Sequence, residues 1–392
     1  MKAAPTAAAA GVLLAVLAGC ATEPEPAQVD PTPVAVDEPA KASDVSPQSL
    51  PLPLAPFEVV ATGWTEQPLE HDGIFLGIRS PEAPEDPLRF ITTDSEGTVL
   101  WEAERPPSCT GFALSRATDR PVAVLTDLES TDDAVAQTTA TAYDLATGER
   151  LWGPVDVPGP HHGPGLVFSS SAPRAAIGET GPRAALDPAT GATVRDEKDQ
   201  PGTAVVGEYD GVVLTAADGA LTATGPDGEE RWSLPLTDAG IPEGSGVTSV
   251  AGARPPDGTA LVGPAGAESG ALIDLADGTV LATDVEDARR DPGTGTVVTR
   301  AEAVVTGRTA EGTAWTRELD GEVTLAGVGG VLAYLRVGDA VQVLNAATGE
   351  DATVYVEGAS PLAVPALFSS DGAAVVPLDE QLLVTTRPVG AE

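Results

Sequence analysis

Short runs of β-branched and other apolar residues alternate with polar turns along most of the chain, and seven of these turns are closed by a glycine. The seven glycines are Gly97, Gly148, Gly191, Gly228, Gly278, Gly312 and Gly349. Successive glycines are 51, 43, 37, 50, 34 and 37 residues apart, with a mean of 42. A hairpin that recurs at this period is typical of a β-propeller, in which each repeat is one four-stranded blade. The pattern therefore predicts an all-β fold built from antiparallel blades.

The stretch from Thr203 to Leu236 shows the four strands of one repeat most clearly. Its β-prone runs cover 203–208, 212–216, 220–224 and 230–234. The first two turns between them are Asp210-Gly211 and Asp218-Gly219. Asp-Gly turns supply the positive φ angles that tight hairpins need, so this stretch is expected to form one complete blade.

Two further positions recur around the glycine that closes each last hairpin. Four residues before it, a short polar side chain can cap the turn in four copies, as Asp144, Asp187, Asp274 and Asn345. Three or four residues after it, four copies have a tryptophan: Trp101, Trp152, Trp232 and Trp315. On an outer strand this ring is expected to lie flat between neighbouring blades. Arg195, Ala282 and Thr353 take the position elsewhere, and those seams are expected to be weaker.

The sequence outside the seven repeats predicts an eighth blade. The residues from Glu357 to Pro388 contain three β-prone runs, at 362–368, 373–376 and 381–385, and lack an outer strand. A lone β-prone run from Phe57 to Trp64 precedes the first repeat and can supply that strand. Sharing a blade between the two ends of the chain removes exposed sheet edges. We predict eight blades, with seven as the alternative.

The first 20 residues have the pattern of a bacterial lipoprotein signal. An apolar stretch from Ala7 to Ala18 follows Lys2 and is too short for a permanent transmembrane helix. The sequence Leu17-Ala18-Gly19-Cys20 is a lipobox. Its resemblance to bacterial lipoproteins implies a signal peptide at 1–19 and a diacylglyceryl group on Cys20, which becomes the mature N-terminus. We expect a lipid-anchored protein on the extracytoplasmic face of the cell membrane. An ordinary secretory signal is the alternative.

Composition predicts a tether between the lipid and the folded domain. The segment from Ala21 to Pro56 has nine prolines, no aromatic residue, and six acids against Lys41. Such a segment cannot form a core by itself, so we expect a disordered, solvated tether at 20–56 and a propeller domain at 57–392.

The formal net charge of −38 restricts the partners. A surface this acidic is repelled by nucleic acid and by anionic lipid head groups. The lipid on Cys20, and not the protein surface, is therefore expected to hold the chain at the membrane. Weak binding of divalent cations over the whole surface is compatible with this charge. Cys109 has no partner in the mature chain; a buried thiol is the preferred interpretation, and a reactive thiol is the alternative.

The residues Asp144, Thr147, Gly148 and Trp152 together resemble the pyrroloquinoline-quinone-type propeller repeat. The resemblance covers about 57–388. The combination of repeat and lipid anchor is similar to the lipoprotein propeller of the outer-membrane β-barrel assembly machinery, which implies a scaffold for other proteins. The WD40 class is the second choice because its histidine and Trp-Asp signature is missing.

Candidate chemistry is sparse. Enzymes of the quinone family use adjacent cysteines and an Asp, Glu and Asn set around calcium, whereas the predicted domain has only Cys109 and Asn345 of the Cys and Asn types. The neighbouring residues His161 and His162 can hold a transition metal, although an exposed loop is the preferred interpretation. His71 is expected at the surface. The acidic run 127–133, which contains Glu129, Asp132 and Asp133, departs from the calcium-loop pattern.

These observations predict a binding protein and not an enzyme. We expect no cofactor and no catalytic residue, a monomeric chain, and unidentified cell-envelope proteins as partners. Fold analogy alone does not transfer an activity. The alternatives are a quinone- or metal-dependent oxidoreductase and a cell-wall or ligand-binding sensor.

Overall fold

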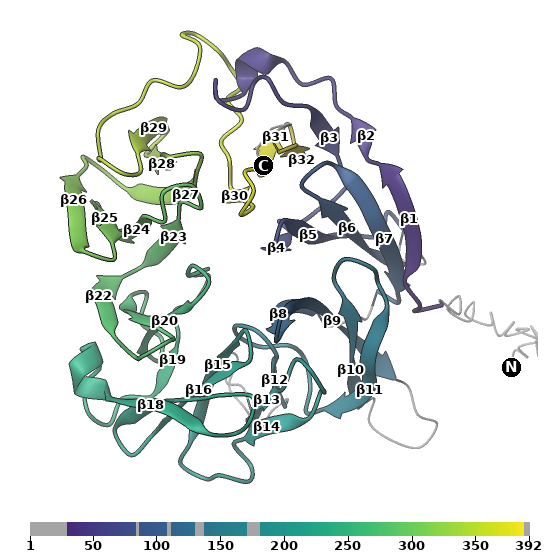
Figure 1. Ribbon diagram of the computed structural model, residues 1–392, viewed down its shortest axis with the longest axis vertical. Coiled ribbons are helices and arrows are strands. Elements are labelled where there is room, and N and C mark those ends of the chain that lie inside the picture. Colours follow the sequence, from purple (N-terminus) through teal and green to yellow (C-terminus); the bar gives the residue numbers. More distant parts are fainter. Residues whose placement is uncertain (1–29, 84–85, 108–110, 130–136, 171–180, 388–392) are drawn as a thin grey trace, which may run out of the picture.

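The computed structural model describes residues 30–83, 86–107, 111–129, 137–170 and 181–387. Eight antiparallel sheets are arranged around a central axis and form a closed β-propeller (Figure 1). The predicted eight blades are therefore confirmed, and the alternative of seven is wrong. In the described part of the chain, no helix is both long and apolar enough to cross a membrane.

The first four blades follow one another along the chain. Blade 1 contains β4 (Leu69–His71), β5 (Ile74–Arg79), β6 (Leu88–Asp94) and β7 (Thr98–Arg105). Blade 2 contains β8 (Phe112–Ala117), β9 (Arg120–Glu129), β10 (Gln137–Asp144) and β11 (Arg150–Val157). Blade 3 contains β12 (Val167–Ser169), β13 (Arg183–Leu186) and β14 (Thr193–Asp196), and its inner position is taken by His161, which bridges to Phe168. Blade 4 contains β15 (Ala204–Tyr209), β16 (Val212–Ala217), β17 (Ala220–Thr224) and β18 (Glu230–Pro235).

The other four blades complete the ring. Blade 5 contains β19 (Val247–Ser249), β20 (Thr259–Pro264), β21 (Gly270–Asp274) and β22 (Val280–Val285). Blade 6 contains β23 (Asp287–Arg290), β24 (Val297–Ala301), β25 (Val304–Thr309) and β26 (Gly312–Glu318). Blade 7 contains β27 (Val323–Gly329), β28 (Leu332–Val337) and β29 (Ala340–Asn345). Blade 8 contains β30 (Leu367–Phe368), β31 (Ala374–Leu378), β32 (Gln381–Thr385), β3 (Val59–Ala61) and β2 (Lys41–Ala42).

Blade 8 joins the two ends of the chain, as the sequence predicts. Strand β3 pairs with β32, with Val60 opposite Val384. The run from Phe57 to Trp64 thus supplies the outer strand that the C-terminal part lacks. The ring is closed by backbone hydrogen bonds between segments more than 300 residues apart.

The segment before Phe57 differs from the prediction of a disordered tether. Strand β1 (Val34–Pro39) pairs with the outer strand of blade 1, and β2 pairs with β3 of blade 8 (Figure 1). After the short 3-10 helix η1 (Pro47–Ser49), Leu50 and Leu54 are buried against blades 7 and 8. We call residues 34–42 the strap. A strand added at a sheet edge is held by backbone hydrogen bonds and needs no apolar pattern, so the composition of this segment did not indicate that it is a strand. The folded part therefore extends at least to Asp30.

Tryptophans close four of the seams between blades. The indole Nε1 of Trp101 in blade 1 donates to the carbonyl oxygen of Leu145 in blade 2 at 2.9 Å. Equivalent bonds, of 2.8 or 2.9 Å, join Trp152 to Pro188, Trp232 to Leu275 and Trp315 to Ala346. Each ring lies between its own blade and the last hairpin of the next blade. A buried donor is thereby satisfied while a large apolar surface is removed from water.

All seven hairpin glycines have positive φ, between 70° and 118°. At four of them, a Cβ atom would also meet the tryptophan of the preceding blade. These four are Gly148, Gly191, Gly278 and Gly349, with closest approaches of 3.0, 2.6, 2.8 and 2.7 Å to Trp101, Trp152, Trp232 and Trp315. Glycine is therefore required at these turns for two reasons, the backbone conformation and the close approach of an indole ring.

The seam between blades 3 and 4 has the smallest apolar cluster among the described residues. The cluster contains Val167, Ala185, Val205 and Val213. Arg195 stands at the tryptophan position here, and its Nη2 donates to Thr224 Oγ1 at 3.0 Å. Polar contacts supplement the apolar packing at this seam, which is consistent with the weaker packing expected from the missing tryptophan.

Candidate functional site: the central cavity

The inner strands of the blades surround a cavity of about 1110 Å³ on the propeller axis. Its lining includes residues from all eight blades, most of them on the innermost strand or on the turn that follows it. A cavity of this size can hold a drug-sized molecule or a short segment of a partner protein. The blades bring together residues that are as far apart in sequence as Gln67 and Ser370.

The charges around the cavity contrast with those of the whole chain. The protein has 59 acidic and 21 basic residues. All three histidines and four arginines nevertheless line this one cavity; the arginines are Arg183, Arg254, Arg289 and Arg290. The lining acids are Glu70, Glu208, Asp210 and Asp257. The cavity is thus much richer in positive groups than the rest of this acidic protein.

His71 joins two blades that are not neighbours in the ring. Its Nε2 lies 3.0 Å from Asp210 Oδ1, so a hydrogen bond connects blade 1 to blade 4. The prediction of a surface histidine was wrong, because His71 is only 5% exposed. Burial acts to lower the pKa of His71, but the hydrogen bond and the negative charge of Asp210 outweigh it, and the pKa is raised.

A second ion pair supports this junction. Arg116 Nη2 of blade 2 lies 2.6 Å from Asp72 Oδ1 and 3.4 Å from His71 Nδ1. The negative charges of Asp210 and Asp257 also act on Arg116 and His71. The acids at this end of the cavity are therefore balanced by cations of the same cluster.

Glu208 ties three blades together behind the cavity wall. It accepts hydrogen bonds from Ser115 Oγ of blade 2 at 2.9 Å, from the backbone N–H of Leu166 in blade 3 at 2.8 Å, and from that of Gly211 in blade 4 at 2.5 Å. The residue is 1% exposed. Burial raises the pKa of Glu208 to about 7, although these hydrogen bonds oppose the change.

The buried Glu208 predicts a pH-dependent stability. Its pKa rises on folding from 4.5 to about 7, so folding takes up a proton between these values. The stabilisation is complete below pH 4.5 and is lost as pH rises toward 7. The free energy of unfolding of the wild type is expected to fall by about 2 kcal/mol more than that of Glu208→Gln between pH 5 and 7.5.

Urea unfolding of both proteins across this pH range measures the difference. Glu208→Gln is expected to be the less stable protein at pH 5, because one of the groups that donate to Glu208 then faces the glutamine NH2 group, which cannot accept. The prediction concerns how steeply the free energy of unfolding changes with pH in each protein, and not the absolute stability of either one. Parallel slopes for the two proteins would show that the carboxylate stays ionised throughout.

The vicinal histidines lie at the cavity wall and not in an exposed loop. His161 Nε2 is 2.7 Å from the carbonyl oxygen of Gly165, and its ring packs edge-on against Phe168 with 6.0 Å between centroids. Burial lowers the pKa of both His161 and His162. Among the described residues, no group of three or more His, Cys, Asp or Glu side chains could hold a metal ion.

The remaining candidate residues are placed only in part. Asp127 pairs with Arg105, with 2.9 Å between Asp127 Oδ1 and Arg105 Nε. Asp132, Asp133, Cys109 and the lipidation candidate Cys20 lie outside the described residues. The polar residue four positions before the hairpin glycine caps the turn in the example of Asp144. Its Oδ1 accepts hydrogen bonds from the backbone N–H groups of Ala146 and Thr147 at 3.0 and 2.9 Å.

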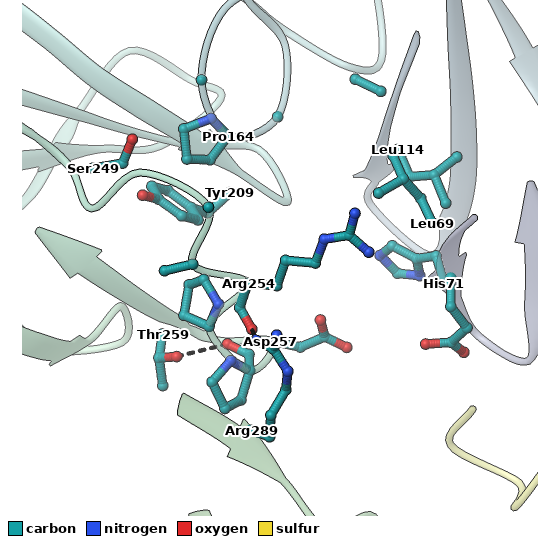
Figure 2. Close-up of a pocket in the computed structure, with 18 of the residues that line it drawn as sticks. Leu69, His71, Leu114, Pro164, Tyr209, Ser249, Arg254, Asp257, Thr259 and Arg289 are labelled. Atoms are coloured by element: carbon teal, nitrogen blue, oxygen red, sulfur yellow. Dashed lines mark hydrogen bonds between the residues drawn. The ribbon is translucent and has the colours of Figure 1, made fainter. Parts of the chain in front are cut away.

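The loop 250–258 of blade 5, between β19 and β20, lies in the cavity (Figure 2). Its Arg254 reaches blade 1, where Nη1 donates to the carbonyl oxygen of Pro68 at 3.4 Å. The backbone carbonyl of Arg254 accepts from Arg289 Nη1 at 2.7 Å, and the same Arg289 is paired with Asp287. The sequence analysis missed this site. The available signal was the turn sequence Arg254-Pro-Pro-Asp-Gly258, which is longer than the two-residue turns of other blades.

No protein-family model and no curated protein matches this sequence. Solved structures similar to it include BBS1N in complex with ARL6DN, 13% identical over 90% of this chain and 99% of that chain, with a TM-score of 0.38. The β-propeller domain of Myceliophteria thermophila Cps50 (Swd1) is 8% identical over 84% and 99% of the two chains, with a TM-score of 0.39. Kluyvelomyces marxianus Hsv2 is 9% identical over 79% and 86%, with a TM-score of 0.34.

Proposed function

We propose that this chain is a lipid-anchored binding protein on the extracytoplasmic face of the cell membrane, and that it holds an envelope protein at its central cavity. The observation that carries the proposal is the cavity itself, which a closed ring of eight blades holds open. Rigid blades position the loops at the axis, and such loops commonly bind partners. The predicted resemblance to scaffold lipoproteins agrees with this proposal.

The strap formed by residues 34–42 limits how far from the membrane the propeller can meet its partner. Because β1 and β2 pair with blades 1 and 8, only ten residues separate Cys20 from Asp30, the first residue that the structure describes. Ten residues span at most about 36 Å when fully extended. A lipid on Cys20 would therefore keep the propeller close to the bilayer, and a membrane protein or a membrane-proximal protein is the partner that fits.

Crosslinking in cells tests the proposal. A photoreactive residue at Ser370, which is exposed at the cavity, is expected to give one reproducible adduct with an envelope protein. The matched control is Ser233 on the outer strand β18, which is also exposed and is expected to give none. The Cys20→Ser variant is expected to leave the membrane fraction. Equal labelling at both serines, or none at Ser370, would contradict binding at the cavity.

A ligand-binding sensor is the second candidate function. The same cavity favours it, because an enclosed space lined by apolar and charged side chains suits a small molecule as well as a protein segment. This candidate predicts saturable binding by the isolated protein, without any membrane component.

A further inference from the structure

We propose that the central cavity binds a small organic anion with an apolar body, and that Arg254 is the residue that holds the negative group. The inference rests on the charges and walls of the cavity, and it goes beyond the proposed protein partner and the lipid anchor. It makes no use of the residues near Cys20.

The first argument is the charge balance around Arg254. Among the described residues, no carboxylate lies within ion-pair distance of its guanidinium, whereas the neighbouring Arg289 is 2.7 Å from Asp287. The negative charge of Asp287 acts on Arg254 as well, but from beyond ion-pair distance. Among the described arginines of the cavity, Arg183 and Arg290 likewise have no ion pair, and only Arg289 has one. An anion would supply the missing charge, and guanidinium binds carboxylates and phosphates through paired hydrogen bonds.

The other acids of the cavity do not neutralise Arg254. Asp257 acts on His71, Arg116 and Arg290, and Asp210 is hydrogen-bonded to His71. The charges that act on Arg254 are instead those of Arg289, which lowers the pKa of Arg254, and Asp287, which raises it. The surrounding protein lowers the pKa of the Arg254 guanidinium, and the positive charge of Arg289 lowers it further. The negative charge of a bound anion would stabilise the charged guanidinium and so oppose this lowering of the pKa.

The second argument is that the guanidinium of Arg254 is accessible from the cavity. The side chain is exposed, and it extends from the loop into the space between blades 5 and 1 (Figure 2). Its single side-chain hydrogen bond in the described structure, to Pro68, is long at 3.4 Å. Most of its donors therefore remain available to a ligand. The protein around it excludes bulk water in part, which strengthens an ion pair relative to one on an open surface.

The third argument concerns the walls beside the guanidinium. Leu69, Leu114, Pro164 and Tyr209 line the same cavity and are partly exposed to it (Figure 2). These apolar surfaces come from blades 1 to 4, whereas the loop that carries Arg254 comes from blade 5. A ligand with an apolar body could cover them while its anionic group meets the arginine. The volume of about 1110 Å³ is ample for such a molecule.

Two dyes of nearly the same shape test the proposal. The first is 8-anilinonaphthalene-1-sulfonate, an aromatic anion, and the second is N-phenyl-1-naphthylamine, which lacks the sulfonate. The wild type is expected to bind the anionic dye saturably with one dye per chain. In Arg254→Gln, its Kd is expected to rise at least about tenfold, the equivalent of one charge-assisted contact, while that of the neutral dye changes less than about twofold.

The matched control is Arg231→Gln, which removes an equally exposed arginine on the outer strand β18, and its Kd values are expected to equal those of the wild type. Arg254→Gln is expected to keep the wild-type melting temperature, because the side chain makes a single long hydrogen bond. Benzoate and inorganic phosphate are then added as competitors of the anionic dye. Displacement by either one supports the site and identifies the preferred anion.

Three outcomes would overturn the proposal. They are the absence of saturable binding of the anionic dye, an equal loss of both dyes in Arg254→Gln, and failure of both competitors to displace the dye. The Cys20→Ser protein is expected to bind the dye like the wild type. Failure of the crosslinking experiment would therefore leave this inference intact, and failure of the dye experiment would leave the protein-partner proposal intact.

Discussion

Trp101→Ala is expected to lower the free energy of unfolding by about 3 to 5 kcal/mol. The side chain is fully buried in the seam between blades 1 and 2, where it packs against Tyr143 with 6.4 Å between ring centroids. Alanine would leave a cavity in this seam. It would also leave the carbonyl of Leu145 without the indole donor that lies 2.9 Å away in the wild type. Urea unfolding followed by far-ultraviolet circular dichroism measures the loss.

Trp101→Phe separates the two contributions to this seam. Phenylalanine keeps most of the aromatic surface but cannot donate to Leu145, so a smaller loss of about 1 to 3 kcal/mol is expected. A loss below about 1 kcal/mol for Trp101→Ala would show that the tryptophan contributes little and that the seam depends on the other residues of its apolar cluster.

Gly278→Ala is expected to destabilise the protein much more than Gly228→Ala. Both glycines close the last hairpin of a blade, and both have a φ of 79°. A Cβ at Gly228 meets nothing within 4 Å, whereas a Cβ at Gly278 would lie 2.8 Å from the ring of Trp232. Gly228→Ala is expected to cost only the backbone conformation, about 1 to 2 kcal/mol. Gly278→Ala is expected to cost about 1 to 3 kcal/mol more, because the indole ring must move.

Thermal and urea unfolding of the two variants compare these losses directly. Because the two glycines have the same φ, each protein is the control for the other, and the difference reports the contact with Trp232. Equal destabilisation would mean that the ring moves freely and that glycine is needed at these turns for its backbone conformation only.

The blade count and the hairpins could be predicted because their cause is local. An Asp-Gly or Thr-Gly turn determines the backbone conformation of four residues, and the β-prone runs on both sides determine the strands. Every boundary of the four strands predicted in 203–234 lies within one residue of the corresponding boundary of β15 to β18. The seam role of Trp101 was also predicted, from its register four residues after Gly97 on an expected outer strand.

The strap could not be predicted from composition. The segment 34–42 has few apolar residues, and it is ordered because its backbone pairs with Thr98–Arg105 on one side of the ring and with Val59–Ala61 on the other. Edge strands of a propeller offer unpaired N–H and C=O groups, and any extended segment held nearby can use them. Nothing in residues 34–42 alone indicates that these edges lie within reach.

The repeat, the eight blades and the closure of the ring by both termini could be predicted from the sequence alone, since they depend on turn chemistry and on the spacing of apolar runs. Only the tertiary structure decided the environment of His71, the junction at Glu208 and the unpaired Arg254. Each of these depends on residues that are contributed by different blades and meet at the axis. Charge balance at a site is a property of the assembled ring, because electrostatic interactions depend on distance in space and not on position along the chain.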